Sequence, residues 1–470
     1  MANPRPLHEV KEPVLCEDTF PYSLPPRIQF DGVVTEEIDG VRYEVDLSKV
    51  AERELVITDT TFRDGQQARP PYTIDQTARL YELLSRLSGP NGVIRQTEFF
   101  LYSKKDRLAV DACRNLGLEY PQITGWIRAD LSDLYLVKQM KLPETGLLTS
   151  CSDYHIFMKL RLDRRKAFDN YLAVVKEALA NGIRPRCHLE DSTRADLYGF
   201  VIPFVQAAMR LSEDLPPDKK VKVRLCDTMG FGLSYPNAAL PRSVPKLVLL
   251  MLHECGVPSE NLEWHGHNDF HKVMINATTA WLYGCNALNG TLLGIGERTG
   301  NPPVEGAIME YIALKGELNG VNTHVITEIA EYYRSIGTRI SVRYPLVGDD
   351  FHKTRAGIHA GGLSADERIY NIFDTSALLD RPPEVAITDK SGADGIALWV
   401  NNFLGLHGPD RIRMSKMVKI MRWVTDQYDL HGRTTAISDK ELIQQIKIHL
   451  SEQYKEAEVA GRLTMVHHEA

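Results

Sequence analysis

Eight short β-rich runs alternate with helical stretches between Leu55 and about residue 316, and this alternation narrows the possible folds more than any other feature. In the first helical stretch, TIDQTARLYELLSRL, Thr73 and Gln76 have the spacing of a capping box, and leucines recur at helical intervals. Alternation of this kind predicts a parallel α/β sheet. The eight runs span residues 55–60, 93–100, 122–128, 146–150, 184–190, 221–227, 262–265 and 287–293.

Alternation alone fits a closed (β/α)₈ barrel and an open, doubly wound sheet almost equally well. A barrel places the C-terminal end of every strand on one active-site face, whereas a doubly wound sheet uses mainly the ends beside one crevice. Here a polar residue or glycine closes all eight runs, which favours an α/β fold of the (β/α)₈ TIM-barrel type. These closing residues are Asp59, Glu98, Arg128, Ser150, Glu190, Asp227, His265 and the glycines after Leu293.

The sequence divides into three parts around this pattern. Residues 1–50 are rich in proline and charge, so we expect an N-terminal extended arm. Residues 51–320 hold the expected catalytic barrel. In residues 321–470 the alternation is lost and helical spacing returns after residue 411, which predicts a mostly helical C-terminal region.

The composition, 43% hydrophobic and 25% charged, is that of a soluble globular protein. A net charge of −7 and a pI near 6.1 argue against nucleic acid and anionic membranes as partners. The seven cysteines are scattered without a CxxC pair, which fits neither a disulfide framework nor a thiolate zinc site. With no basic and apolar leader pattern and no apolar run of about 18 residues, we expect a cytoplasmic location.

His265 and His267 stand at i and i+2 at the end of a predicted strand, so their imidazoles point to the same side and can reach one ion. Asp64 follows the first predicted strand, which in an eight-stranded barrel lies two places from the seventh. The three side chains predict a catalytic divalent-metal site with open coordination positions, for Mn²⁺ in the first place and otherwise Mg²⁺, Co²⁺ or Zn²⁺. The alternative is that the histidines only make hydrogen bonds in a polar barrel mouth.

Four motifs in the same order between about residues 50 and 400 resemble a known family. They are DTTFRDGQQ at 59–67, HGHND at 265–269, GIGERTGN at 294–301 and GIHAGG at 357–362. Together they resemble the DRE-TIM metallolyases, which include isopropylmalate, homocitrate and citramalate synthases. The resemblance implies a metal-dependent Claisen condensation of acetyl-CoA with a 2-oxo acid, followed by hydrolysis that releases CoA.

The resemblance also implies a role for each matching residue. The implied metal-binding residues are Asp64, His265 and His267, with Asn301 bound to the metal or to one of its ligands. The implied catalytic residues are Arg63, Glu190, His359 and Tyr370. The implied substrate-binding residues are Gln67, Arg186, His188, Thr228 and His155.

Physical chemistry gives these roles a rationale. Arg63 supplies a fixed cation beside oxygens that gain negative charge during enolisation and condensation. The relatives insert the equivalents of His359 and Tyr370 into the neighbouring subunit's site, so the resemblance implies a homodimer. Glu190 and His359 would then form an acid/base pair for the acetyl methyl group. The plainer alternatives are a rim salt bridge for Arg63, an ordinary turn for Thr228, a scaffold role for His155 and simple packing for His359 and Tyr370.

Oxaloacetate is the favoured 2-oxo acid, because Arg186 and His188 together offer cationic partners to a dicarboxylate. His188 stands where homocitrate synthases carry a small hydroxyl residue. Segments outside the four motifs, FFLYSKKD, TGWIRAD, SCSDYHIF and HGHNDFHK, resemble the branch of the family that condenses acetyl-CoA with oxaloacetate. A homocitrate synthase that uses 2-oxoglutarate is the main rival, and citramalate and isopropylmalate synthases remain open.

Other functions of similar barrels fit less well. Lyases of the hydroxymethylglutaryl-CoA type carry a reactive cysteine in the glycine loop, which residues 291–301 lack, and no biotinyl Met-Lys-Met segment accompanies the barrel. The glycine loop lacks the Gly-Lys-Ser/Thr ending of a P-loop, so we expect no ATP or NAD. An inactive barrel kept as a metal-binding subunit is the alternative outside catalysis.

Overall fold

The computed structural model describes residues 5–406 and 408–463. The chain forms two compact units. The first contains residues up to 19 together with 26–336, and the second contains residues 20–25 together with 337 onward. Within the described residues, no helix combines the length and apolar character needed to cross a bilayer.

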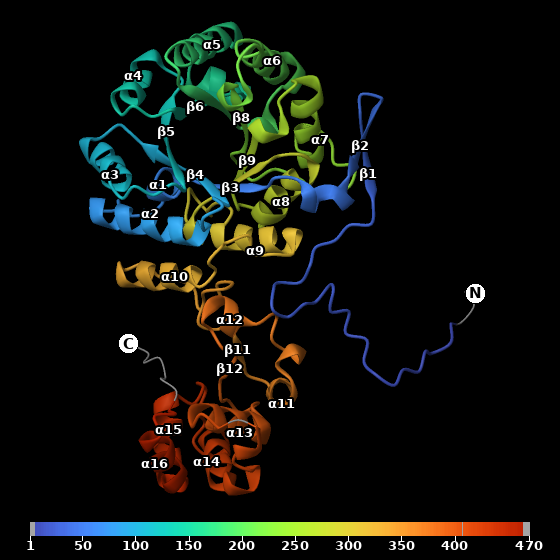
Figure 1. Cartoon of the computed structure of the whole chain (residues 1–470), viewed down its shortest axis with the longest axis vertical. Coiled ribbons are helices and arrows are strands. Elements are labelled where there is room, and N and C mark those ends of the chain that lie inside the picture. Colours follow the sequence, from blue (N-terminus) through green and yellow to red (C-terminus); the bar gives the residue numbers. More distant parts are fainter. Residues whose placement is uncertain (1–4, 407, 464–470) are drawn as a thin grey trace. The chain divides into compact units, whose positions relative to one another are not determined.

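Eight parallel strands close into a barrel in the first unit, which confirms the predicted TIM-barrel fold. Consecutive strands are neighbours, and the last strand closes the ring by pairing with the first (Figure 1). The strands are β3 (Val56–Asp59), β4 (Ile94–Phe100), β5 (Gln122–Arg128), β6 (Glu144–Ser150), β7 (Arg184–Glu190), β8 (Lys222–Asp227), β9 (Leu262–Gly266) and β10 (Ala287–Gly290).

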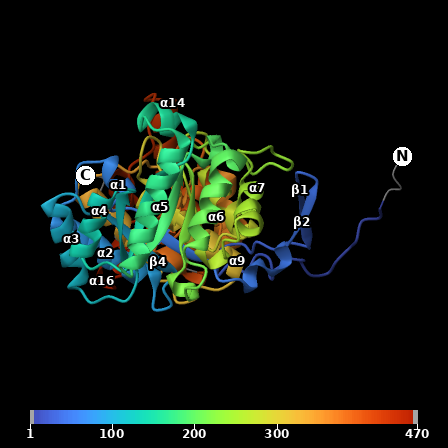
Figure 2. The ribbon, with the colours of Figure 1, turned by 90° about the horizontal axis from the view of Figure 1, so that it is seen from above.

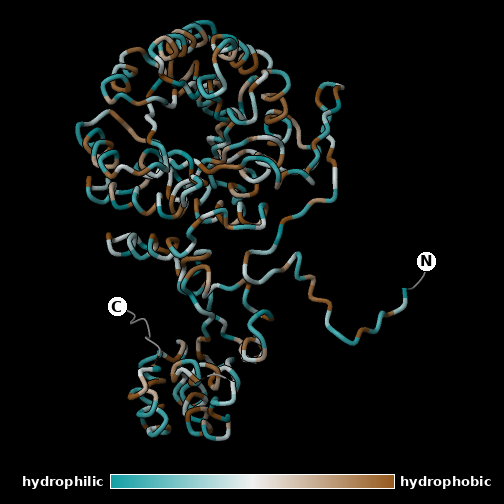
Figure 3. Tube along the Cα trace, viewed as in Figure 1, coloured by the Kyte–Doolittle hydropathy of each residue, from teal (hydrophilic) through white to brown (hydrophobic). Residues whose placement is uncertain are grey.

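Helices surround the strands as an outer ring (Figure 1), and Figure 2 shows one side of this helical layer from above. Hydrophobic and hydrophilic residues alternate along these helices (Figure 3), as expected for helices with one face on a core. The ring helices are α2 (Ile74–Ser88), α3 (Lys104–Arg114), α4 (Leu131–Gln139), α5 (Arg164–Ala180), α6 (Ile202–Arg210), α7 (Val244–Leu249), α8 (Val273–Tyr283) and α9 (Val304–Lys315).

Helix α2 shows how local sequence sets an element of the ring. Its capping box is present as predicted: the Thr73 hydroxyl accepts from the Gln76 N–H, and the Gln76 side chain accepts from the Thr73 N–H. Its leucines at helical spacing, Leu80 and Leu84 among them, are fully buried. At the other end Gly89 adopts a φ of 69° and a ψ of 178°, a conformation that only glycine adopts readily.

The structure differs from expectation near the N-terminus. Instead of a wholly extended arm, residues 33–46 form an antiparallel hairpin of β1 (Val33–Ile38) and β2 (Val41–Asp46). The hairpin lies beside α7 (Figure 1), and its Tyr43 hydroxyl donates to Glu254 in the segment Leu250–Glu254 that follows this helix. Alternating Val, Ile and Tyr residues favour strands despite the charges between them.

Two boundaries at the end of the barrel also differ. The eighth strand ends at Gly290 and not at Leu293, because the N–H of Thr291 bonds the carbonyl of Pro302 and draws the chain into the glycine loop. The first unit extends to residue 336 and not 320, because it includes α10 (Val325–Ser335). This helix packs on α2 and places the Tyr333 hydroxyl 2.7 Å from that of Tyr72.

The second unit is mostly helical, as predicted. Its core gathers buried residues such as Ile396, Ile420 and Ile446 from three helices. Its elements are β11 (Lys353–Thr354), α11 (Gly357–Ala365), α12 (Thr375–Leu379), β12 (Glu384–Val385), α13 (Gly392–Phe403), α14 (Val418–Asp429), α15 (Asp439–His449) and α16 (Ser451–Val459).

Asp59, the last residue of β3, anchors the loop that follows it. Its buried carboxylate accepts from the N–H and hydroxyl of Thr61 and from the Thr97 hydroxyl of β4. The Thr61 oxygen also accepts from the N–H of Leu292, so one carboxylate ties the first loop to the glycine loop. Burial raises the pKa of Asp59 to about 6.

We expect Gly89→Ala to lower the free energy of unfolding by several kcal/mol more than Gly117→Ala. Both glycines have positive φ, at a cost of about 1 to 2 kcal/mol for an L-residue. A Cβ at Gly89 would collide with the carbonyl of Gly320, whereas a Cβ at Gly117 has nothing within 4 Å. Denaturant unfolding of both variants measures the difference, and equal losses would contradict the crowding seen at Gly89.

We expect Asp59→Asn to alter how stability depends on pH. The folded pKa of about 6 exceeds the unfolded value of 3.8. Between these values the unfolded chain ionises while the folded carboxyl keeps its proton, so the free energy of unfolding falls as the pH rises. Relative to wild type, the free energy of unfolding of Asp59→Asn should rise by roughly 2 kcal/mol from pH 4 to pH 7. Asp214→Asn, which removes an exposed carboxylate, is the control, and parallel pH profiles for Asp59→Asn and wild type would refute the expectation.

Candidate active site

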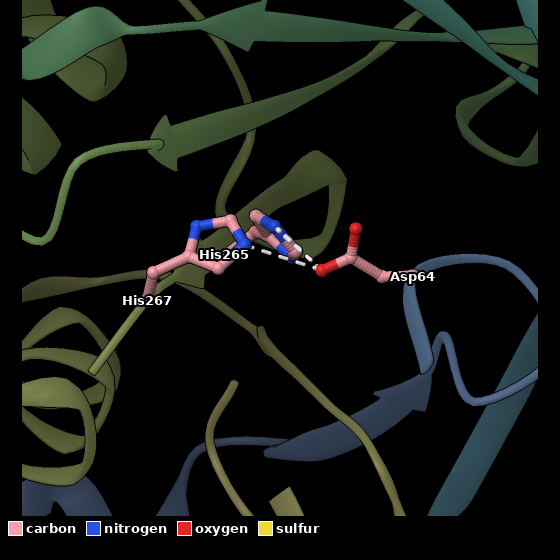
Figure 4. A group of neighbouring side chains, drawn as sticks. All are labelled: Asp64, His265 and His267. Atoms are coloured by element: carbon pink, nitrogen blue, oxygen red, sulfur yellow. Dashed lines mark hydrogen bonds and ion pairs between the residues drawn. The ribbon is translucent and has the colours of Figure 1, made fainter. Parts of the chain in front are cut away.

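Asp64, His265 and His267 converge at the C-terminal end of the barrel strands (Figure 4). Asp64 opens the short helix α1 (Asp64–Gln67) after β3, and the histidines end β9 and begin the loop beyond it. Oδ2 of Asp64 lies 3.2 Å from Nε2 of His267 and 3.9 Å from Nε2 of His265. One ligand atom from each of the three buried residues lies within 4.8 Å of the others. The structure therefore brings the predicted metal-binding residues together.

The donor set fits a divalent ion. Burial by itself would raise the pKa of Asp64, but Arg63, His267 and His265 together hold that pKa well below its usual range. Burial lowers the pKa of His265 to about 3, although Asp64 opposes the change. The site thus offers an ionised carboxylate and a neutral imidazole, which are the protonation states that bind metal.

Asn301 lies beside this group in the glycine loop. Its Nδ2 donates to the carbonyl of Gly266, the residue between the two histidines, at 3.1 Å. Its Oδ1 is buried and has no hydrogen-bond partner among the described residues, and a side chain at Gly296 would collide with it. A buried acceptor without a partner fits the predicted role in binding the metal or a metal ligand.

Arg63 lies over the same site. Its Nη1 donates to Oδ1 of Asp64 at 2.8 Å, and its guanidinium stacks 4.4 Å above the ring of Trp126. Its Nε is buried without a hydrogen-bond partner among the described residues. The rim salt bridge and the predicted catalytic role are therefore compatible, because donors remain for a negatively charged oxygen.

Glu190 sits in a polar cluster at the end of β7. Its Oε2 accepts from Ser150 and lies 2.6 Å from Nζ of Lys159 and 3.0 Å from Nδ1 of His155. Burial would raise its pKa, but the close His155 imidazole and the charge of Lys159 outweigh burial and hold the pKa at about 2. Glu190 is thus a carboxylate that already has an imidazole in its own barrel.

His155 and Lys159 both belong to the π-helical segment Tyr154–Lys159. Such segments are rare and are frequent at functional sites. Lys159 was not predicted from the sequence, although its position four residues after His155 could have indicated a shared helical face.

Arg186 lies deeper in the barrel than predicted. Its side chain is 1% exposed and pairs with Glu144 at 3.0 Å and Glu263 at 3.1 Å. Its charge is thereby neutralised within the protein, so this placement does not support the predicted contact with a substrate carboxylate. Strand alternation correctly placed Arg186 inside the barrel but did not reveal the two carboxylates opposite.

His188 lies above that cluster, and its pKa is well below the usual value because of burial and nearby cations. Its Nε2 is 3.4 Å from Glu98, and its Nδ1 is 3.5 Å from Nη1 of Arg224. The ring fills space beside Gly146, where an added Cβ would meet it at 2.6 Å. His188 is therefore a neutral imidazole and not the second cation that the sequence predicted.

Arg224 is a buried residue that the sequence analysis missed. It binds Glu263 through two nitrogens and Glu98 through a third. The signal was present in the run VKVRLCD, where Lys222 and Arg224 alternate with apolar residues and so share an inward face.

The remaining predicted substrate residues lie at the rim. Oγ1 of Thr228 accepts from the N–H of Asp191 at 2.8 Å, an arrangement that also fits the plainer turn. Gln67 is exposed at the end of α1.

His359 and Tyr370 are brought together in the second unit. Their ring centroids are 4.2 Å apart, and Tyr370 packs over Gly362 of α11, where an added Cβ would meet the ring at 2.5 Å. Tyr370 is 45% exposed. The GIHAGG motif thus supports a paired His and Tyr at the surface of this unit.

Comparisons with known proteins agree with these features. A model of the HMGL-like family matches residues 54–332. A protein of Syntrophus aciditrophicus (strain SB) named citrate (Re)-synthase is 54% identical over 449 residues, which cover 95% of this chain and 69% of that protein. A protein of Clostridium kluyveri with the same name is 49% identical over 439 residues, which cover 93% and 94% of the two chains.

A third relative is a 2-phosphinomethylmalate synthase of Streptomyces hygroscopicus. It is 37% identical over 440 residues, which cover 92% of this chain and 95% of that protein. The family model spans more than half of the chain, and all three relatives align along most of it. The motifs, the barrel and these matches together place the chain in the HMGL-like family, the divalent-metal-dependent DRE-TIM metallolyases.

Proposed function

We propose that this protein is a citrate (Re)-synthase, a transferase that condenses acetyl-CoA with oxaloacetate and then releases citrate and CoA. The observation that carries the proposal is the 54% and 49% identity to two proteins of that name over nearly the whole chain. The metal-binding group and Arg63 beside it supply the parts that enolate chemistry on a 2-oxo acid requires.

Asp64, His265 and His267 would hold the divalent ion, with Asn301 as a further ligand or as a partner of one. We propose Mn²⁺ as the native ion, with Mg²⁺, Co²⁺ and Zn²⁺ as alternatives that such a donor set accepts. The bound ion supplies a Lewis acid that polarises the carbonyl of the 2-oxo acid.

The chain's own residues provide the remaining chemistry. Glu190, with His359, would take a proton from the acetyl methyl group, whose carbon then bonds to the keto carbon of oxaloacetate. The keto oxygen gains negative charge beside the Arg63 guanidinium and takes up a proton. Water finally adds to the thioester carbonyl and the CoA thiol leaves, so atoms balance as citrate and free CoA.

The other predicted residues would bind and orient the substrates. We propose that Tyr370 acts beside His359, that Gln67 orients water near the metal, and that Thr228 and His155 contact the oxo acid. The ion pairs of Arg186 with Glu144 and Glu263 favour a supporting role for this residue beneath the site.

Selection of oxaloacetate would depend on His188. Its ring occupies the space beside Gly146 and is supported from below by Arg224. A small hydroxyl residue at this position, as in homocitrate synthases, leaves room for the longer 2-oxoglutarate. His188 would therefore set the depth of the pocket and not its charge.

We also propose a homodimer in which His359 and Tyr370 reach the partner's site. In this division the first unit, with residues 26–336, carries the hairpin and the catalytic barrel, and the second unit from residue 337 onward would complete the dimer and the active site. We propose further that the protein is a cytoplasmic enzyme that supplies citrate in the tricarboxylic acid cycle.

With Mn²⁺ and acetyl-CoA, we expect wild-type protein to release CoA thiol at least roughly tenfold faster, as kcat/KM, with oxaloacetate than with 2-oxoglutarate, pyruvate or 2-oxoisovalerate. Mass spectrometry identifies the product, and isotopically labelled acetyl-CoA establishes the face of attack. Asp64→Asn should lose both Mn²⁺ binding and thiol release.

The His188→Ser variant tests the basis of selection. It should reduce the oxaloacetate to 2-oxoglutarate preference by about tenfold, because it deepens the pocket by more than one methylene. Turnover of 2-oxoglutarate but not oxaloacetate by wild type would reject the citrate assignment in favour of a homocitrate synthase.

Mixed dimers test whether His359 acts across the subunit boundary. Glu190→Ala and His359→Ala should each lose more than about a hundredfold in kcat, because each lacks one member of the acid/base pair. A purified heterodimer of the two variants should regain about half of the wild-type activity, because one of its two sites then contains both residues.

The reciprocal heterodimer is the control. It pairs wild type with the double variant Glu190→Ala, His359→Ala, so with residues supplied in trans each site carries one defect and activity stays low. The opposite result, an inactive first heterodimer and a half-active second one, would show that both residues act within one chain.

A further inference from the structure

Asn289 is a fully buried residue of β10 that none of the four motifs contains. Its Oδ1 lies 2.7 Å from Nδ1 of His265, on the side of the imidazole away from Asp64. The register of the barrel pairs Asn289 with His265 on β9 and with Thr58 on β3. Three neighbouring strands thus set these side chains in a row beneath the metal-binding group.

The protons along this row can be assigned from its lower end. Arg224 donates to the Glu263 carboxylate from Nε at 2.7 Å and from Nη2 at 3.2 Å, and Nη1 of Arg186 donates at 3.1 Å. Glu263 held between two arginines is an acceptor only. The Thr58 hydroxyl, which bonds Glu263, must therefore donate its single proton there.

The orientation of the Asn289 amide follows from the proton of Thr58. Because the Thr58 hydroxyl has used its proton, its oxygen can only accept, and it lies 2.9 Å from Nδ2 of Asn289. The Thr58 carbonyl, also an acceptor, lies 3.3 Å from the same nitrogen. A flipped amide would place its oxygen against two acceptors, so the oxygen of Asn289 must face His265.

We propose that Asn289 is a positioning residue that holds His265 in the tautomer with its proton on Nδ1. The Nε2 lone pair of His265 then faces Asp64, where a divalent ion would bind. The arginines below set this state through Glu263, Thr58 and Asn289 in turn. The inference rests on the proposed metal-binding role of His265 but not on the identity of the 2-oxo acid.

The buried charges of Arg186, Arg224 and Glu263 would thus serve to fix the tautomer of His265. Without an acceptor at Nδ1, His265 would distribute its proton between both nitrogens, and the form with Nε2–H cannot bind metal. Residues that orient metal-binding imidazoles in this way typically change metal affinity by about 10-fold to 100-fold when they are removed.

The first test reads the tautomer directly in metal-free wild-type protein. Proton-nitrogen correlation spectra of protein with ¹⁵N-labelled histidine report which ring nitrogen carries the proton, and loss of a signal in His265→Gln identifies His265 among the 15 histidines. We expect the proton on Nδ1. A proton on Nε2 would overturn the proposal without any further variant.

The second test measures Mn²⁺ affinity in the absence of substrates, from the electron paramagnetic resonance signal of free Mn²⁺. Asn289→Leu, which removes the acceptor, should weaken binding by about 10-fold to 100-fold. Asn289→Asp keeps an acceptor toward His265 but sets its second oxygen against the two Thr58 acceptors, so it should retain the Nδ1–H tautomer and weaken Mn²⁺ binding less than Asn289→Leu does. Wild-type affinity in Asn289→Leu would overturn the proposal.

Asn286→Leu is the matched control. Asn286 is also buried, immediately precedes β10, and donates from Nδ2 to the carbonyl of Glu54 at 2.8 Å, away from the metal-binding group. Its substitution should lower stability without changing the His265 tautomer or Mn²⁺ affinity. If Asn289→Leu and Asn286→Leu lost equal Mn²⁺ affinity, Asn289 would support only the fold and would not position His265.

Discussion

Closure of the barrel is the constraint on which the site depends. Strand β10 pairs with β3 on one side and β9 on the other, so the residue after the first strand meets residues about 200 positions later. The same pairing sets Asn289 between His265 and Thr58. One backbone register therefore positions the metal-binding side chains and also fixes the proton of a histidine among them.

The interior below the site is charged but electrically balanced. Among the described residues of the barrel interior, the carboxylates of Glu98, Glu144 and Glu263 face three cations, Arg186, Arg224 and Lys222. A network of this kind adds little to stability compared with an apolar core, because desolvation offsets the attraction between the charges. Its contribution is orientation, since each hydrogen bond restricts the next.

The sequence was sufficient to predict the barrel, because polar residues close every apolar run, and to predict the metal-binding group, because Asp64 and the two histidines follow strands that must converge. It also placed Arg186 and His188 on the inward face. It did not reveal their partners, because strand alternation defines the direction of a side chain and not its depth in the barrel. Asn289 was missed for the same reason: only the register shows what lies beside it.

The neighbours of Arg186 and His188 change how the protein would recognise a dicarboxylate. Arg186 is paired and His188 is neutral, so neither of these two described residues offers a free positive charge to an entering anion. Above them, Arg63 keeps a buried Nε without a partner in the described chain, beside the metal-binding group. The negative charge of a substrate would therefore be met at the rim, by the metal and Arg63 together, while the neutral interior below defines length. In the proposed mechanism, charge and length would thus be recognised by different residues, and a change of substrate would arise at His188 without disturbing the groups proposed for the condensation.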